Sequence, residues 1–280
     1  MIKGLKTTEG TEIPFEQIDP VRDAAKFHVS PATLAYLKHD STRRDFLRGS
    51  ISASQWGKGL RQLFLEATAE VYVGAHDSLA ALMGTSKHAH ILTEGLDKGD
   101  VATEVRMFSR GNRLISGQAD QIVTVAPGKV EIWDNKTGKK YSLKMYRTEI
   151  ETHGYTYQLN LLADLYRMGN PGAEVTRLAI EWIPSDAGRG DEKLEIIDVP
   201  MWEYGRAFDA YAELLSGLVD AINSKVPPPV CNEEERWSRF DKKAGRIVNI
   251  KCEEFCSYAA ACRAASASID EIHPMDGSNV

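Results

Sequence analysis

Two aspartates and a lysine lie in two consecutive apolar stretches of the chain that have the pattern of a hairpin. Asp120 lies in the middle of the first stretch, and Asp134 and Lys136 end the second. Because residues two apart on a strand share a face, Asp134 and Lys136 point the same way, and a hairpin can bring Asp120 beside them. Two carboxylates that converge in this way suit a hard divalent cation such as Mg²⁺, which takes oxygen ligands and keeps several waters.

The lysine on the same face extends this chemistry. Its ammonium group can hold or help to deprotonate a metal-bound water, and it can neutralise charge on a phosphate. Metal, water and cation together are the minimum set for hydrolysing a phosphodiester. Asp134 and Lys136 alone are also compatible with an ordinary salt bridge on a surface hairpin, so the hypothesis depends on the residues around them.

The four cysteines of the chain are a second signal. Cys231, Cys252, Cys256 and Cys262 all lie in the last fifth of the sequence, with the spacing C-x20-C-x3-C-x5-C. The residues up to Gln17 are polar and lack the apolar segment of a signal peptide, so we expect a cytoplasmic protein without disulfides. Clustered thiols in a reducing compartment favour zinc or an iron–sulfur cluster, although the spacing differs from the paired C-x2-C of structural zinc sites. The alternative is four incidental buried cysteines.

Composition narrows the class of protein. The 280 residues are 42% hydrophobic and 26% charged, which excludes a largely disordered chain. No run of about 18 apolar residues occurs, so no membrane-spanning helix is expected. The net charge of −6 argues against a protein whose whole surface binds nucleic acid. Local charge differs, because the run from Lys136 to Arg147 carries four lysines, one arginine and no acid.

The elements that must position these residues follow from the hydrophobic period. Alternation predicts strands over 103–108, 114–125, 129–133, 175–183 and 194–199. Helical spacing predicts helices over 56–73, 76–96, 153–167 and 201–225. Ser30 before Pro31 predicts the start of an earlier helix, after an irregular lead-in over residues 1–30. This order predicts an α/β fold with a mixed central sheet flanked by helices.

Four regions are expected along the chain. They are an N-terminal helical region (1–75), a core that contains the hairpin (76–225), a cysteine segment (226–263) and a disordered tail (264–280). The three prolines from Pro227 onward separate the core from the cysteine segment, because no helix continues through them.

The hairpin resembles a known active site. The string GQAD…VEIWDNKTGKK is similar to the active-site hairpin of PD-(D/E)XK nucleases of the RecB type, in which G-x-x-D precedes D-x-K-T-G. His88, in the run from Gly84, matches the histidine of a G-x-x-x-H motif, and Gln158 matches the glutamine of Q-x-x-x-Y. The same architecture is found in CRISPR-associated RecB-like exonucleases and in many phage-encoded exonucleases. The terminal cysteines look like the iron–sulfur staple of those exonucleases that contain clusters.

This resemblance implies a restriction-endonuclease-like core and a metal-dependent DNA exonuclease that hydrolyses phosphodiester bonds by metal-activated water. It implies Mg²⁺ or Mn²⁺ bound by His88, Asp120, Asp134 and the backbone carbonyl of Asn135. Lys136 and Gln158 join the two aspartates as catalytic residues. It further implies a [4Fe–4S] cluster on the four cysteines, with zinc as the alternative.

Three features depart from the family pattern. Cys231 stands in for a cysteine that related exonucleases carry near the N-terminus, and C-x3-C replaces their C-x2-C. Both differences put the type of cluster in doubt. Leu162 occupies the tyrosine position of Q-x-x-x-Y, so no substrate-orienting role carries over to it.

The expected substrate is DNA, as single strands or duplex ends. Tyr157 and the basic residues after the hairpin are expected to bind the strand: Lys139, Lys140, Lys144 and Arg147. Core packing is the alternative for Tyr157 or its neighbour Tyr155. Glu104 is either an extra metal ligand or a surface charge, and His90 is a rival to His88.

The resemblance places the enzyme in recombination, repair or phage DNA metabolism, with a possible homo-oligomer or recombination partner protein. A structure-specific endonuclease of the same fold is one alternative. A nuclease-like protein that binds DNA or a partner without cutting is another, and the intact set of Asp120, Asp134 and Lys136 speaks against it.

Overall fold

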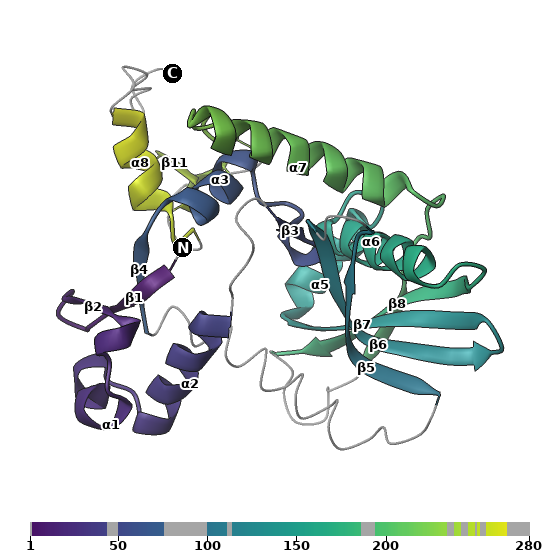
Figure 1. Ribbon diagram of the computed structural model, residues 1–280, viewed down its shortest axis with the longest axis horizontal. Helices are drawn as coiled ribbons and strands as arrows, with labels where there is room; N and C mark the ends of the chain where they lie inside the picture. The colour runs from purple at the N-terminus through teal and green to yellow at the C-terminus, as the bar shows by residue number, and fades with distance from the viewer. Residues whose placement is uncertain are drawn as a thin grey trace. The chain divides into compact units, whose positions relative to one another are not determined.

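The computed structural model describes residues 2–43, 50–75, 100–110, 114–185, 194–233, 238–241, 246–249, 251–252 and 256–267 (Figure 1). The chain forms two compact units. The first comprises Met1–Gly49, Gly57–Leu82 and Ser216–Val280, and the second comprises Ser50–Trp56 and Met83–Leu215. Each unit is built around its own sheet.

A six-stranded mixed sheet is the centre of the second unit. Its strands are β3 (Ile51–Ser52), β5 (Val101–Phe108), β6 (Ile115–Ala126), β7 (Lys129–Gly138), β8 (Glu174–Pro184) and β9 (Glu195–Asp198). Their order is β3-β6-β7-β8-β9, with β5 also paired to β6. The β6–β7 and β8–β9 pairs are antiparallel and the β7–β8 pair is parallel. The predicted α/β fold with a mixed central sheet is therefore confirmed.

Helices accompany this sheet. They are α5 (Lys140–Thr148), α6 (Gly154–Gly169) and α7 (Arg206–Ser224), and the short η3 (Ala53–Gln55) follows β3. Helix α6 packs on the sheet (Figure 1). Its leucines on that side, which include Leu159 and Leu162, are fully buried. Gly117 allows this close approach, because a Cβ atom there would lie 2.4 Å from Cδ2 of Leu162 and would force the leucine to shift. The α5 helix was not anticipated from the sequence.

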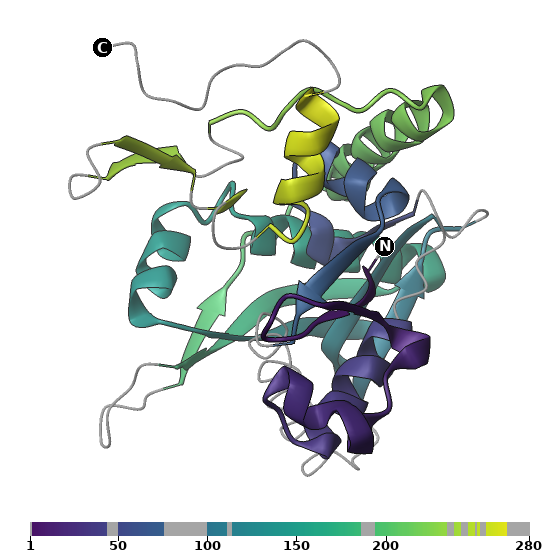
Figure 2. The same ribbon diagram turned by 90° about the vertical axis from the view of Figure 1, so that its left-hand side faces the viewer.

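The first unit contains a smaller sheet. Strands β1 (Ile2–Lys6), β2 (Glu12–Pro14) and β4 (Val71–Gly74) lie in the order β2-β1-β4. The elements packed with them are η1 (Phe15–Gln17), α1 (Pro20–Asp23), η2 (Ala24–Phe27) and α2 (Pro31–Arg43), drawn in purple in Figure 2. Leu5, Phe27 and Leu34 are fully buried in this core.

Part of the first unit differs from the sequence-based expectation. Residues 1–30 form strands and short helices in place of an irregular lead-in, and the helix expected over 56–73 is divided between α3 (Leu60–Thr68) and β4. The cause is the parallel pairing of β1 with β4, which joins segments far apart in the sequence. Ser30 does cap α2, because its Oγ accepts a 3.1 Å hydrogen bond from the backbone N–H of Thr33.

The cysteine segment also belongs to the first unit. It contains the antiparallel hairpin of β10 (Ser238–Asp241) and β11 (Arg246–Asn249), followed by α8 (Ala259–Ala267). Helix α8 extends past the expected start of the disordered tail at residue 264, and residues 268–280 lie outside the described part of the chain.

The division into units differs from the expected regions at both ends of the core. Ile51 pairs with Ile115, which places residues 50–56 in the second unit, and α7 passes from the second unit into the first at Ser216. The helix expected over 76–96 lies outside the described residues. Among the helices that the structure describes, none has both the length and the apolar character needed to span a membrane.

Candidate active site

Strands β6 and β7 bring the two predicted aspartates together. Gln121 pairs with Trp133 and Ile122 with Ile132, so the next positions in this register are Asp120 and Asp134. Asp134 is 2% exposed and Asp120 is 8% exposed. The ladder opens at this point, because Oδ2 of Asp120 accepts a 2.7 Å hydrogen bond from the backbone N–H of Asn135. The carboxylate of Asp120, rather than a backbone carbonyl, therefore accepts the hydrogen bond of this N–H group of β7.

Lys136 and Gln158 complete the site. The Nζ atom of Lys136 lies 2.5 Å from Oδ2 of Asp134 and donates a 3.3 Å hydrogen bond to Oε1 of Gln158. The Nε2 atom of Gln158 donates in turn to Oδ1 of Asp134 at 3.1 Å. These three side chains form a closed ring of polar contacts between β7 and α6. The structure therefore brings together the four residues expected to be catalytic, namely Asp120, Asp134, Lys136 and Gln158.

The charge of Lys136 is set by its surroundings. Burial lowers the pKa of its ammonium group, but the attraction and hydrogen bond of Asp134, with a further contribution from Asp120, outweigh burial and raise the pKa above its ordinary value. The amine is accordingly protonated at neutral pH. It places a positive charge directly beside two buried carboxylates.

A cluster of aromatic side chains, formed by Tyr155, His153 and Tyr146, contacts this ammonium group through Tyr155. The Nζ atom of Lys136 lies 4.9 Å from the ring centroid of Tyr155, a cation–π distance. Tyr155 contacts His153 and Tyr146, with ring centroids 4.6 Å and 5.6 Å away. Burial lowers the pKa of His153 and raises the pKa of Tyr146. Sequence reasoning missed His153 and Tyr146, because they reach the site from the start of α6 and from α5 and share no motif.

The donor set suits a divalent cation. Asp120 and Asp134 offer carboxylate oxygens, which are the ligands that Mg²⁺ and Mn²⁺ prefer, and water can complete such a shell. In the described ranges, no group of three or more His, Cys, Asp or Glu side chains is placed to hold a metal ion. His88 and its rival His90 lie outside the described residues. Glu104 has a positive φ of 54°, and its carboxylate accepts a hydrogen bond from Gln118.

Comparison with known proteins gives a fold and no family. No family model and no curated relative matches this chain. The crystal structure of SSO0001 is 14% identical and has a TM-score of 0.50, with 84% of this chain and 96% of that chain covered. At this identity the similarity shows a shared fold alone.

Two further matches are structures of the alkaline exonuclease LHK-Exo from Laribacter hongkongensis. The first is 10% identical, and the second, in complex with dAMP, is 12% identical. Both have a TM-score of 0.36 and cover 64% of this chain and 90% of that chain. These TM-scores are too low to support an inference about the present chain.

The predicted DNA-binding residues fall into two groups. Lys139, Lys140 and Lys144 are exposed on α5 or at its N-cap, and Arg147 forms an ion pair with Glu195 of β9. Tyr157 is different, because its ring stacks on Trp56 with centroids 3.9 Å apart and meets Trp202 edge-on at 4.6 Å. Core packing, the alternative for this tyrosine, accounts for these contacts.

The cysteine segment is attached to α3 by a buried arginine. Arg61 is 4% exposed. Its Nη1 donates to the carbonyl of Pro228 at 2.6 Å and its Nε donates to Sγ of Cys262 at 3.1 Å. Burial, with Cys262 nearby, raises the pKa of Cys256. Among the described residues, which include all four cysteines, no group of three or more His, Cys, Asp or Glu side chains is placed to hold a metal ion.

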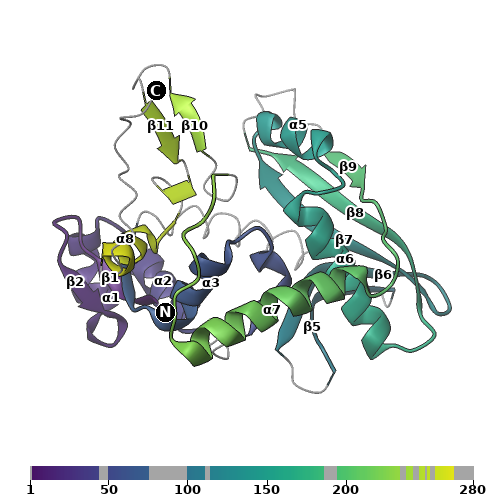
Figure 3. The same cartoon turned by 90° about the horizontal axis from the view of Figure 1, so that it is seen from above.

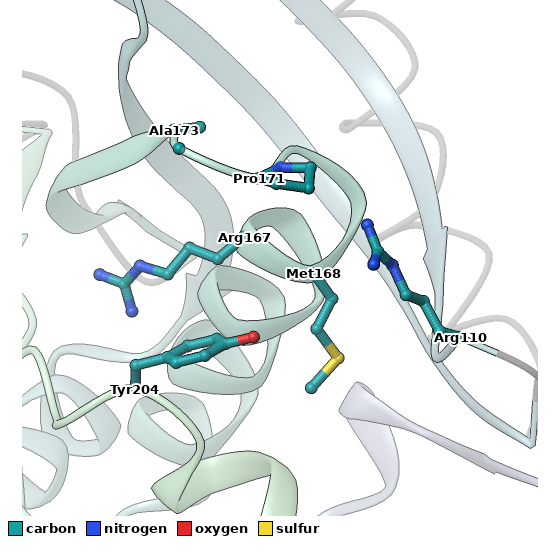
Figure 4. Close-up of a pocket in the computed structure, with 7 residues that line it drawn as sticks. Arg110, Arg167, Met168, Pro171, Ala173 and Tyr204 are labelled. Atoms are coloured by element: carbon teal, nitrogen blue, oxygen red, sulfur yellow. The ribbon is translucent and has the colours of Figure 1, made fainter.

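A separate open pocket of about 400 Å³ lies near the C-terminal end of α6 (Figure 4). Its lining includes Arg110, Arg167 and Tyr204. Arg167 lies 3.8 Å from Asp164 and packs over the ring of Tyr204, so its charge is already engaged. Gln158 lies nine positions earlier on the same helix, about 14 Å away along its axis. The pocket is therefore distinct from the carboxylate site.

Proposed function

We propose that this protein is a metal-dependent deoxyribonuclease that hydrolyses phosphodiester bonds, and that it acts as an exonuclease. The observation that carries the proposal is the polar ring of Asp134, Lys136 and Gln158, together with the buried carboxylate of Asp120 bound to the backbone of Asn135 beside it. Two carboxylates and a lysine occur together on many surfaces. Their burial, with hydrogen bonds that fix each one, is typical of a site that is built to do chemistry.

Each residue has a distinct part in this proposal. Asp120, Asp134 and the backbone carbonyl of Asn135 would hold Mg²⁺ or Mn²⁺, with His88 as a proposed further ligand. The cation, when bound, supplies Lewis-acid activation of water and of the phosphate. Lys136 brings a positive charge to the phosphate that is being attacked. Gln158 orients Lys136 and Asp134 through its two hydrogen bonds.

The basic surface beside the site supports nucleic acid as the substrate. Lys139 and Lys140 follow Lys136 closely in the chain and are exposed, as is Lys144 one turn later. Lysine ammonium groups at such spacing bind the phosphates of a strand and give an affinity that falls with salt. The setting in recombination, repair or phage DNA metabolism rests on the resemblance of the hairpin motif.

A metal cluster on the four cysteines is a separate proposal. A [4Fe–4S] cluster, or zinc in its place, would cross-link the cysteine segment, which is part of the first unit. Cys262 already lies against Arg61 of α3, which supports an anchoring role for this segment. Iron, acid-labile sulfide and zinc contents of anaerobically purified protein test it. Stoichiometric iron and sulfide support the cluster, and stoichiometric zinc supports the alternative. Protein that contains neither iron nor zinc overturns the proposal.

The nuclease proposal is tested with end-labelled linear DNA and covalently closed circles, in Mg²⁺ or Mn²⁺. The comparison is between the wild type, Asp134→Asn and Asp198→Asn. Asp198 is an exposed aspartate on β9 that pairs with Arg177, so its substitution is the matched control. Loss of linear DNA alone, abolished only by Asp134→Asn, supports the exonuclease. Cutting of circles supports the endonuclease instead, and no metal-dependent cutting by the wild type leaves a DNA-binding or partner-binding role.

A further inference from the structure

The outer face of α5 carries an exposed aromatic ring among cations. Tyr141 is 70% exposed and Met145, one turn later, is 38% exposed. Lys140 and Lys144 are exposed at the adjacent positions of the same helix. Residues four apart on a helix lie on one face, so the two lysines and the two apolar side chains form neighbouring stripes.

The inner face of α5 fixes its position against the carboxylate site. Tyr146 is fully buried, and its ring centroid lies 4.8 Å from His153 in an edge-on contact and 5.6 Å from Tyr155. Tyr155 in turn packs against the ammonium group of Lys136. Figure 3 shows α5 beside β9, and the ion pair between Arg147 and Glu195 joins the two elements. The exposed stripes are therefore on a helix whose inner face packs against Tyr155, the ring that contacts Lys136.

The charge of this segment suits a polyanion. The run from Lys136 to Thr148 contains no aspartate or glutamate. Arg147 pairs with Glu195, and Lys140 and Lys144 place two further positive charges at exposed positions of α5, where a ligand can reach them. Two lysines four positions apart are separated by about 6 Å along the helix axis, so their long side chains can reach neighbouring phosphates of one strand.

The exposed ring restricts the kind of polyanion. A tyrosine that is mostly in water gains from stacking on a flat apolar ligand, and an unpaired base has such a face. Bases inside a duplex have both faces covered by their neighbours. Tyr141 between Lys140 and Lys144 thus matches a strand whose bases are free and whose phosphates run along the helix.

We propose that α5 is a binding track for single-stranded nucleic acid, with Tyr141 stacked on an unpaired base and Lys140 and Lys144 on the flanking phosphates. This inference rests on the proposed nuclease function, because it names the substrate class of the same site as a single strand or an unpaired end. Tyr141 is a binding and specificity residue here, with no part in the chemical step.

Binding is measured by fluorescence anisotropy in EDTA, so that no cleavage occurs. The probes are a labelled oligothymidine and a blunt hairpin duplex with the same number of phosphates. The proteins are the wild type, Tyr141→Ala, Tyr141→Phe and Tyr204→Ala. Tyr204 is an exposed tyrosine of the same unit, outside α5, and its substitution controls for the loss of a surface ring.

The expected result is a loss of about tenfold in affinity for oligothymidine in Tyr141→Ala, with affinity for the duplex changed less than twofold. Tyr141→Phe keeps the ring and is expected to bind as the wild type does, and so is Tyr204→Ala. An unchanged Tyr141→Ala variant, or an equal loss on both probes, overturns the proposal. Binding of polyglutamate or anionic vesicles that depends on Tyr141 and exceeds binding of oligothymidine also overturns it.

The same experiment separates this inference from the proposed function. If the protein binds single strands through Tyr141 but does not cut DNA with Mg²⁺ or Mn²⁺, the binding track is supported and the proposed nuclease function is overturned. DNA cleavage that depends on Asp134, together with an affinity for single strands that is unchanged in Tyr141→Ala, supports the nuclease and overturns the proposed binding track.

Discussion

The backbone N–H of Asn135 donates a 2.7 Å hydrogen bond to Oδ2 of Asp120. The bond joins a side chain of β6 to the backbone of β7. The carboxylate of Asp120 is therefore held by the strand that carries Asp134 and Lys136. One oxygen of Asp120 is thereby fixed by the protein, and the geometry of the two-aspartate site is set before any ligand arrives. Such preorganisation is what a hydrolytic centre requires.

Substitution of Asp120 by Asn separates the charge of this residue from its structural bond. The amide oxygen of the new side chain can still accept from Asn135, so the fold is expected to persist. Loss of one anionic ligand is expected to lower metal-dependent cleavage about 100-fold or more, because Lewis-acid stabilisation contributes several kcal/mol. Initial cleavage rates over a Mn²⁺ titration check this. A rate within threefold of the wild type would remove Asp120 from the site.

Gln158→Leu tests the positioning role of the glutamine. Asp134 and Lys136 each lose a buried hydrogen-bond partner, so we expect a loss of about 1–3 kcal/mol in the free energy of unfolding. We also expect slower cleavage by about 10- to 100-fold, since groups that orient ligands have effects of this size. Urea unfolding and cleavage rates are measured on the same preparations. Normal cleavage by a destabilised variant would make Gln158 a purely structural residue.

Arg61→Ala tests the anchor of the cysteine segment. Arg61 holds the carbonyl of Pro228 and Cys262, so its removal leaves buried acceptors without their donor, at a cost of about 1–3 kcal/mol. We expect limited proteolysis to cut the segment after residue 226 faster than in the wild type. Arg263→Ala, at an exposed position of α8, is the control. Equal cleavage patterns in the two variants would contradict the anchoring role.

The stability of the first unit is expected to depend on pH through Asp23. Its buried carboxylate accepts hydrogen bonds from Arg22, Lys26 and the backbone N–H of Asp19, and these hold its pKa well below the ordinary value. A depressed pKa in the folded state means that the stabilisation is complete above the unfolded pKa, about 4, and is lost as the pH falls toward the folded pKa.

Thermal unfolding of the wild type and Asp23→Asn from pH 7 to pH 3 measures this dependence. The variant lacks the charge and is expected to melt at a lower temperature at pH 7, with the difference shrinking below pH 4. Asp209→Asn, at an exposed position of α7, serves as the control. A difference between wild type and Asp23→Asn that does not change with pH would refute the role of this carboxylate.

Short-range patterns in the sequence were sufficient for the centre of the site. Asp120, Asp134 and Lys136 lie on two strands joined by a tight turn, where alternation sets the face of each side chain. Gln158 could be placed because it stands among leucines on a helix, where a polar group needs a partner. The mixed sheet followed from the order of strands and helices, and the structure confirms it.

Tertiary structure alone decided the rest, because these features join segments that no local period relates. The β1–β4 pair links the N-terminus to residues 71–74, and β3 joins the central sheet by pairing Ile51 with Ile115. The aromatic contacts beside Lys136 bring together Tyr146 of α5 and His153 at the N-cap of α6. Arg61 donates a hydrogen bond to Cys262, which lies 201 positions later in the chain. Local periodicity specifies which face of an element is buried, whereas packing between distant elements determines what that face meets.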